Sequence, residues 1–192
     1  MRKKVIKDEI CEKCLGRKKI YKEETKLWHT CDCVINKARN AIIDDFNGIK
    51  PAAKGFFLEK YKNTNTIFYI KNKEVFWRHF VHFLMYKVPL NVSYEIITAY
   101  DLIDIVFDKH TKFQSYNELY KFDFFIIELE LVFQNKNINE MLDQVIGSRT
   151  SRKKRTWLLS RHNEYLIKEK FSEITTILEY FDFEQYGEGG LI

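Results

Sequence analysis

The stretch TIFYIKNKEVFWRHFVHFLMYK, residues 66–87, contains two patterns of apolar residues, one after the other. TIFYI (66–70) is a short, continuous apolar run, which is typical of a buried strand. In the segment that follows (72–87), the apolar residues recur at the spacing of one helix face, at Phe76, Phe80, Phe83 and Leu84. The stretch therefore predicts a strand that leads directly into an amphipathic helix.

The same alternation continues toward the C-terminus. Further strands are expected at 91–99, 121–130 and 155–160, and further helices at 100–109 and 137–149. Short strands that alternate with helices predict right-handed βαβ crossovers and a mainly parallel sheet, which is an α/β fold. Four aromatic residues on these segments are expected in the core: Trp77, Tyr86, Phe124 and Phe125.

The N-terminal part of the chain has a different organisation. VINKARNAIIDDF (34–46) predicts a short helix that ends near Asn47 and Gly48, and residues 49–63 are expected to connect it to the body. We therefore expect two domains, a small module at 1–46 and an α/β domain at 47–192.

Composition narrows the class of protein. Hydrophobic residues make up 45% of the 192 residues and aromatic residues 16%, which is enough to build a packed core. No apolar run approaches the roughly 18–20 residues of a membrane span, and the charged N-terminus lacks the apolar segment of a secretory signal. A cytoplasmic protein without a membrane partner is expected.

Positive charge is concentrated near the N-terminus. Residues 1–40 contain 12 Lys and Arg against 6 Asp and Glu, whereas the remaining residues contain 20 against 21. A basic head on a neutral body favours contact with an anionic surface, most often nucleic acid. A solvated lysine-rich tail is the alternative.

All four cysteines lie in the basic head, as CEKC and CDC, at Cys11, Cys14, Cys31 and Cys33. Two short cysteine pairs can supply the four thiolates of a tetrahedral Zn²⁺ site. Two disulfides are the alternative, which reducing cytosol would disfavour. His29 could replace one cysteine, but four thiolates already fill the shell. This pattern predicts structural zinc rather than catalytic zinc.

These motifs, in this order, resemble the DnaC/IstB-like helicase loaders, a branch of the AAA+ ATPases. CEKCLGR and HTCDC are similar to the cysteine head of the family, and FNGIKPAAKGFFLEKY takes the place of its connector. TAYDLIDIVF and FDFFIIELEL resemble the helix and the acid-ended strand of the Walker B region. INEMLDQVIGSRTSRKKRTWLLSRHN resembles the helix, strand and polar sensor that follow. The resemblance implies an AAA+-like P-loop fold preceded by a zinc module.

The residues that would bind and hydrolyse ATP do not match the family. A P-loop needs glycines, a lysine and a hydroxyl at fixed spacing, but KNKEVFWRHF has no glycine, and no Ser or Thr follows Lys71 or Lys73. Glu74 near the helix start would repel phosphate. Glu128 could be the first Walker B acid, but Leu129 occupies the second acidic position.

Two further parts of the ATPase are also altered. Ser160 or Asn163 could be polar remnants of the sensor, and KFSEITTILEYFDF (170–183) contains no arginine for a neighbouring subunit. We therefore expect a degenerate domain, a pseudo-ATPase that has no enzymatic activity and binds no ATP. His79, His82, His110 and His162 show no spacing that indicates a catalytic site.

A basic run, SRTSRKKRT (148–156), separates the last predicted helix from the last predicted strand. Its cations could contact the phosphates of single-stranded DNA, and they are Arg149, Arg152, Lys153, Lys154 and Arg155. A solvated loop is the alternative. The glycine-rich tail GEGGLI is expected to be a flexible end.

The resemblance implies a non-catalytic role in replication of a phage or mobile element. The expected partners are a replicative helicase, an active AAA+ loader-like protein or both, with single-stranded DNA as a further partner. Two alternatives stay open. One is an inhibitor or decoy of helicase loading in the host, and the other is a zinc-ribbon nucleic-acid-binding protein unrelated to helicases.

Overall fold

The chain divides between Ile49 and Lys50 into two units, close to the domain boundary expected from the sequence. The structure is a computed structural model that describes residues 10–52, 56–106, 116–129, 136–170, 181–187 and 190–191. Each unit is described separately below.

The first unit contains a hairpin and one helix. Strands β1 (Lys19–Lys22) and β2 (Leu27–Thr30) pair antiparallel, and α1 (Asp32–Asp45) follows almost at once. The helix ends where Asn47 and Gly48 adopt left-handed backbone, with φ of 52° and 78°. Asn and Gly tolerate this conformation best, so the sequence signal for the end of the helix is confirmed.

The second unit is built on a parallel sheet, which confirms the predicted α/β class. Five strands run parallel, in the order β4 (Tyr94–Thr98), β5 (Phe124–Leu129), β6 (Arg155–Ser160), β3 (Thr66–Ile70) and β7 (Asp182–Gly187). A sixth short strand, β8 (Gly190–Leu191), pairs antiparallel with β7. This arrangement is consistent with a P-loop-like α/β fold.

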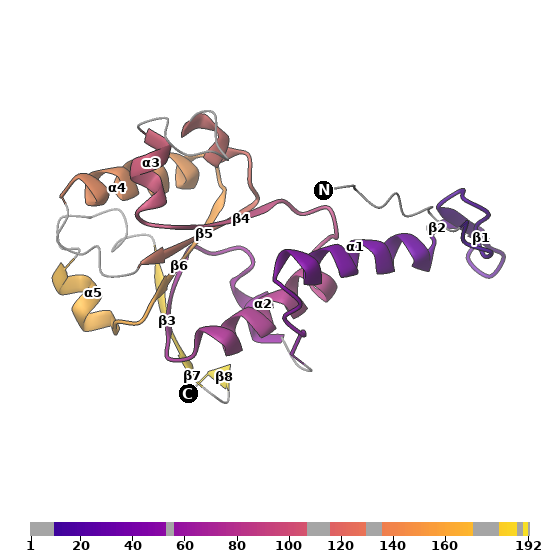
Figure 1. The fold of residues 1–192 in the computed structure, drawn as a ribbon, viewed down its shortest axis with the longest axis horizontal. Helices are drawn as coiled ribbons and strands as arrows, with labels where there is room; N and C mark the ends of the chain where they lie inside the picture. The colour runs from indigo at the N-terminus through magenta and orange to yellow at the C-terminus, as the bar shows by residue number, and fades with distance from the viewer. Residues whose placement is uncertain are drawn as a thin grey trace, which may run out of the picture. The chain divides into compact units, whose positions relative to one another are not determined.

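Helices connect the strands and flank the sheet. They are α2 (Lys73–Tyr86), α3 (Asp101–Val106), α4 (Lys136–Ser151) and α5 (Glu164–Lys170), with 3₁₀ turns η1 (Phe56–Tyr61) and η2 (Tyr116–Tyr120). Figure 1 shows α2 on one side of the sheet and α3 and α4 on the other. Right-handed crossovers require helices on both faces of this sheet. From β3 the chain crosses toward the β4 edge through α2, and from β4 and β5 it returns toward β7 through α3 and α4.

The alternation of side chains along the strands produces two cores of different character. Phe68 and Trp157 point to the α2 side and contact Phe76 and Phe80 in a cluster of aromatic rings. Their neighbours point to the other side, into a mainly aliphatic core formed with α3 and α4, whose members include Ile67, Ile127, Leu158, Leu142 and Val145. Because successive side chains of a strand point to opposite faces, the apolar strands contribute to a core on each face of the sheet.

Several expectations for single segments change. Tyr86 was expected in the core, but it is 49% exposed. Phe124 and Phe125 are buried as expected, and Trp77 is partly buried. Residues 107–115 and 171–180 lie outside the described part of the chain, so the end of the helix expected at 100–109 is not described. The sequence did not indicate β7, and the expectation of a flexible tail is wrong for residues 190–191, which form β8. Within the described residues, no helix combines the length and apolar character needed to cross a membrane.

Candidate functional site

The four cysteines meet at one point in the first unit. Their sulfur atoms all lie within 4.8 Å of one another, with Cys11 and Cys31 3.8 Å apart and Cys14 and Cys33 3.6 Å apart. These distances are too long for disulfides, and all four cysteines are free thiols. In the described part of the chain, this is the one group of His, Cys, Asp or Glu side chains placed to hold a metal ion.

Local backbone geometry positions both cysteine pairs. The first pair is in a tight turn, in which the N–H of Leu15 donates to Cys11 O and the N–H of Arg17 donates to Cys14 O. Gly16 in this turn has a φ of 79°, which favours glycine. The second pair lies at the start of α1, where Cys31 is the N-cap and Cys33 is in the first turn. The positive end of the helix dipole favours thiolates there.

The electrostatics of the cluster favour a bound cation. The backbone N–H groups of Cys14 and Lys13 lower the pKa of Cys11 to about 7. The hydrogen bond with Cys31, together with burial, raises the pKa of Cys33 to about 12. Four thiols this close cannot all ionise unaided, because like charges repel. A divalent cation would compensate their charge and let all four act as ligands.

The donor set fits a tetrahedral metal ion with soft ligands. Zn–S bonds of about 2.3 Å place the sulfurs of an ideal tetrahedron about 3.8 Å apart, and two of the sulfur pairs are at 3.6 and 3.8 Å. His29 is not part of the cluster, because its Nε2 atom lies 2.7 Å from Thr25 Oγ1 in the hairpin. The four cysteines can therefore hold a metal ion without His29.

The junction between β3 and α2 is where a P-loop would be expected. Only Lys71 and Asn72 separate the end of β3 at Ile70 from the start of α2 at Lys73. The Asn72 side chain caps the helix and accepts hydrogen bonds from the N–H groups of Glu74 and Val75. N–H groups at a helix start are the groups that would bind phosphate, and here a side chain already satisfies two of them.

An ion pair fills the adjacent space at the carboxyl ends of the strands. Lys73 Nζ bonds to a carboxylate oxygen of Glu128 at the end of β5, and the two side chains are 32% and 13% exposed. Lys73 is therefore a half-buried, paired lysine and not a freely solvated one. The cavity beside the pair, which Leu129 and Ser160 also line, holds only about 10 Å³.

The two expected polar remnants have local structural contacts. Ser160 is buried and its hydroxyl accepts a hydrogen bond from the N–H of His162. The side chain of Asn163 accepts a hydrogen bond from the N–H of Leu166 at the start of α5. Both contacts hold the backbone after β6. His82 Nδ1 lies 2.7 Å from Ala52 O, which is also a structural contact, while His110 lies outside the described residues.

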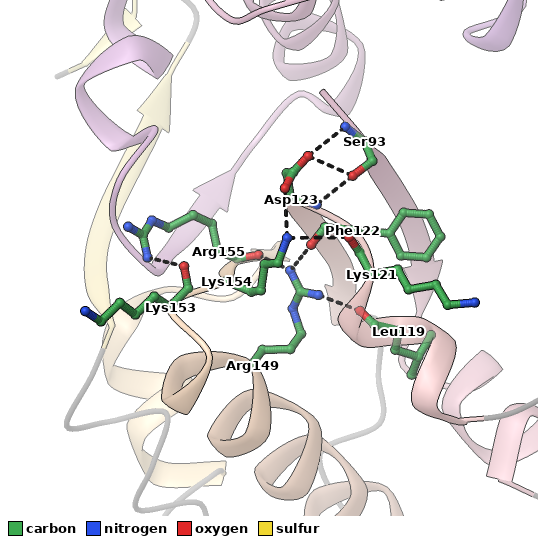
Figure 2. Close-up of polar contacts among 9 residues, drawn as sticks. All are labelled: Ser93, Leu119, Lys121, Phe122, Asp123, Arg149, Lys153, Lys154 and Arg155. Atoms are coloured by element: carbon green, nitrogen blue, oxygen red, sulfur yellow. Dashed lines mark hydrogen bonds and ion pairs between the residues drawn. The ribbon is translucent and has the colours of Figure 1, made fainter. Parts of the chain in front are cut away.

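The five cations of the basic run do not share one environment. Arg149 is fully buried, which contradicts the expectation that it contacts nucleic acid. Its guanidinium donates four hydrogen bonds, to the carbonyls of Leu119, Phe122 and Arg155 and to Thr156 Oγ1. Figure 2 shows it beneath the turn that the other cations form. Burial lowers the pKa of Arg149 to about 10, which still leaves it charged at neutral pH.

The sequence contained a signal for the burial of Arg149. It follows Ile138, Leu142, Val145 and Ile146 at the spacing of one helix face, and all four of these residues are fully buried. The remaining cations of the run come after this helix or at its end. Arg149 therefore belongs to the buried face of α4 and not to the exposed turn.

The exposed turn after α4 contains the other four cations. Arg152 and Lys153 are exposed, and Arg155 is half-buried with its guanidinium bonded to Lys153 O. Lys154 is paired with Asp123 at 2.8 Å. The Asp123 carboxylate also accepts hydrogen bonds from the N–H and hydroxyl of Ser93, as Figure 2 shows. Lys154 and these Ser93 bonds lower the pKa of Asp123 to about 2.

A cleft of about 420 Å³ lies beside this turn, at the amino ends of β5 and β6. Four separate segments line it, and its charged lining residues are Lys62, Lys87, Asp123, Arg152, Lys153, Lys154 and Arg155. Lys62 and Lys87 each pair with Glu59. Six cations against two acids leave the cleft basic, so it can attract a phosphate group.

Comparison of the sequence with models of known protein families gives no match, and comparison with curated proteins gives none either.

Proposed function

We propose that this chain is a non-catalytic, helicase-loader-like protein that acts in the DNA replication of a phage or mobile element. It binds a replicative helicase, an active AAA+ loader ATPase or both, and it leaves ATP hydrolysis to the partner. The main support is the ion pair of Lys73 with Glu128, which occupies the position of nucleotide chemistry in a P-loop-like sheet. The order of motifs described above supplies the link to loaders.

The closed position beside Lys73 and Glu128 supports a non-catalytic role. Phosphoryl transfer needs a wrapped triphosphate, a metal ion and a residue that orients water. Lys73, at the start of α2, is neutralised by Glu128, and Leu129 supplies no second acid. A domain of this kind contributes surfaces for binding other molecules.

The test is capture of a partner followed by a loading assay. The full chain, immobilised, should retain the replicative helicase or the loader ATPase of its native host, equally well with and without ATP. In a reconstituted loading reaction, the loader-like role predicts more helicase on single-stranded DNA, and a decoy predicts less. Capture of neither protein contradicts the proposal.

The cysteine cluster holds a structural Zn²⁺ in this proposal, bound by Cys11, Cys14, Cys31 and Cys33. All four positions are thiolates, so no site for substrate stays open. Purified protein should contain one zinc per chain by elemental analysis, and Cys14→Ser should lose the metal and unfold the first unit. His29→Ala is the matched control and should keep the zinc. Metal-free protein from a chelator-free purification contradicts this assignment.

A second candidate function is nucleic-acid binding without a helicase partner. The basic cleft at the turn after α4 favours it, because its cations are contributed by three segments. Retention of DNA by protein that captures no helicase or loader would support this function over the first.

A further inference from the structure

The hairpin of the first unit has two unlike faces. On one face, Ile20 and His29 stand opposite each other and are half-buried. On the other face, Tyr21 and Trp28 are opposite each other in register, and they are 50% and 60% exposed. A hairpin this short therefore presents two large aromatic side chains to solvent.

The two rings form an ordered pair. Their centroids are 5.6 Å apart and their planes meet at 61°, which is an edge-to-face arrangement. Such a cross-strand pair contributes to hairpin stability, and that contribution explains why the rings touch. It does not explain their exposure, because Trp side chains are highly buried on average in folded proteins. The exposed ring faces are available to a flat ligand.

Positive charge surrounds the aromatic pair. Residues 16–30 contain five cations, Arg17, Lys18, Lys19, Lys22 and Lys26, against two acids, Glu23 and Glu24. Lys19 lies on the same face of the hairpin as Tyr21, because successive side chains of a strand alternate between faces. The ligand that suits this surface has flat rings and negative charge.

We propose that Tyr21 and Trp28 form a stacking surface for the bases of single-stranded nucleic acid, while the surrounding lysines and Arg17 contact its phosphates. Aromatic rings among cations are the usual means of binding single strands, since every base offers a ring face. A duplex is excluded from stacking because its bases already cover one another. This site is in a different unit from the basic cleft and does not depend on the partner proposed above.

The test measures binding of the full chain to a labelled oligothymidylate by fluorescence anisotropy at low salt. Trp28→Ala should weaken binding roughly 5- to 150-fold, the range that corresponds to about 1–3 kcal/mol for one stacked base. Trp28→Phe keeps a ring and should retain most of the affinity. Tyr165→Ala removes an aromatic residue of the second unit that is even more exposed, at 73%, and should change nothing.

Two further measurements separate stacking from a structural effect. The metal content and circular dichroism of Trp28→Ala should equal those of the wild type, and Tyr21→Leu provides a second variant should Trp28→Ala misfold. Saturating oligothymidylate should quench tryptophan emission in the wild type and much less in Trp28→Phe. An affinity unchanged in both alanine and leucine variants, or an equal loss for a duplex of the same length, overturns the proposal.

Discussion

The two ends of the parallel sheet differ in charge and in space. At the carboxyl ends, Lys73 is paired with Glu128 beside a cavity of about 10 Å³. At the amino ends, the turn after α4 brings several cations to a cleft of about 420 Å³, where Asp123 is the one acid in the lining. Ligands of open α/β sheets normally bind at the carboxyl ends, yet here the position beside Lys73 and Glu128 at that end is closed.

This difference shows that a parallel α/β sheet can have a ligand position at its carboxyl ends filled by an ion pair. The connection after β3 is only two residues long, and the Asn72 cap already satisfies two of the N–H groups at the start of α2. At the amino ends, cations outnumber acids in the lining of the cleft. The buried side chain of Arg149 supports the turn that contributes most of these cations. The predictions below test each end separately.

The largest effect is expected from Arg149→Met. The substitution removes the donors that satisfy the carbonyls of Leu119, Phe122 and Arg155 in a buried place. Each buried acceptor left without a donor costs about 1–3 kcal/mol, so we expect the free energy of unfolding to fall by roughly 3–5 kcal/mol. Urea unfolding followed by tryptophan fluorescence measures the change.

Lys153→Met is the matched control for Arg149→Met. Lys153 is in the same turn but is exposed, so its substitution should change the free energy of unfolding by less than about 0.5 kcal/mol. Equal losses in the two variants would mean that Arg149 does not support the turn.

A smaller effect is expected on nucleic-acid binding when the exposed turn is neutralised. Changing Arg152, Lys153 and Arg155 to Gln should lower the slope of log affinity against log salt by up to about 2, at roughly 0.7 for each lost phosphate contact. Lys154 should add little, because it is already paired with Asp123. Binding to an oligothymidylate at several salt concentrations gives the slope.

The opposite end of the sheet supplies the control for this measurement. Lys71 and Arg161 are exposed cations at the carboxyl ends, and neutralising both should leave the slope unchanged. An equal decrease for the two variants would show that charge in general binds the nucleic acid, without a preference for the amino ends.

Asp123→Asn should have a still smaller effect, which depends on pH. The pKa of Asp123 is about 2 in the folded protein and about 3.8 for an ordinary aspartate, so its charge stabilises the fold at pH above 4. This contribution is lost as the pH falls through 2. The side chain is 47% exposed, so we expect only about 1 kcal/mol at pH 7 after solvent screening.

Urea unfolding of wild type and Asp123→Asn at pH 7 and at successively lower pH tests this sign. The difference between the two proteins should shrink as the pH decreases from 4 toward 2. Asp182→Asn, at an exposed position in the same unit, should show no comparable change. A difference that grows on acidification contradicts the pairing of Asp123 with Lys154.

Local pattern was enough to predict the strands and helices that carry strong apolar periodicity. β3 and β6 have the expected bounds, and α2 begins one residue after its expected start because Asn72 is the cap. The cysteine spacing likewise predicted the cluster, since two short pairs can converge only if the hairpin between them folds back. These features depend on neighbours in the sequence.

Features that depend on distant neighbours could not be predicted in the same way. The strand β7, DFEQYG, has little apolar character, and its place is set by pairing with β3 more than a hundred residues earlier. The pairing of Lys73 with Glu128 also joins two remote segments. Arg149 was misassigned because its charge was weighed and its position on the buried face of α4 was not.

The smallest effect is expected from ATP, which we predict not to bind and not to change the melting temperature. The Asn72 cap satisfies the N–H groups of Glu74 and Val75, and Glu128 neutralises the lysine beside them. The cavity of about 10 Å³ is too small for a triphosphate. Millimolar ATP with Mg²⁺ should therefore give no binding heat in isothermal titration and no rise in melting temperature.

An ATP-binding site would be easy to detect by thermal unfolding, because a ligand at a hundredfold excess over its dissociation constant stabilises the fold by about 2.7 kcal/mol. The basic cleft could also attract a triphosphate, so the same titration is repeated with the variant neutralised at Arg152, Lys153 and Arg155. A thermal shift that disappears in this variant locates the anion at the amino ends. A shift that persists there but is lost on changing Lys73 to Ala would place ATP at the carboxyl ends, and the protein would not be a pseudo-ATPase.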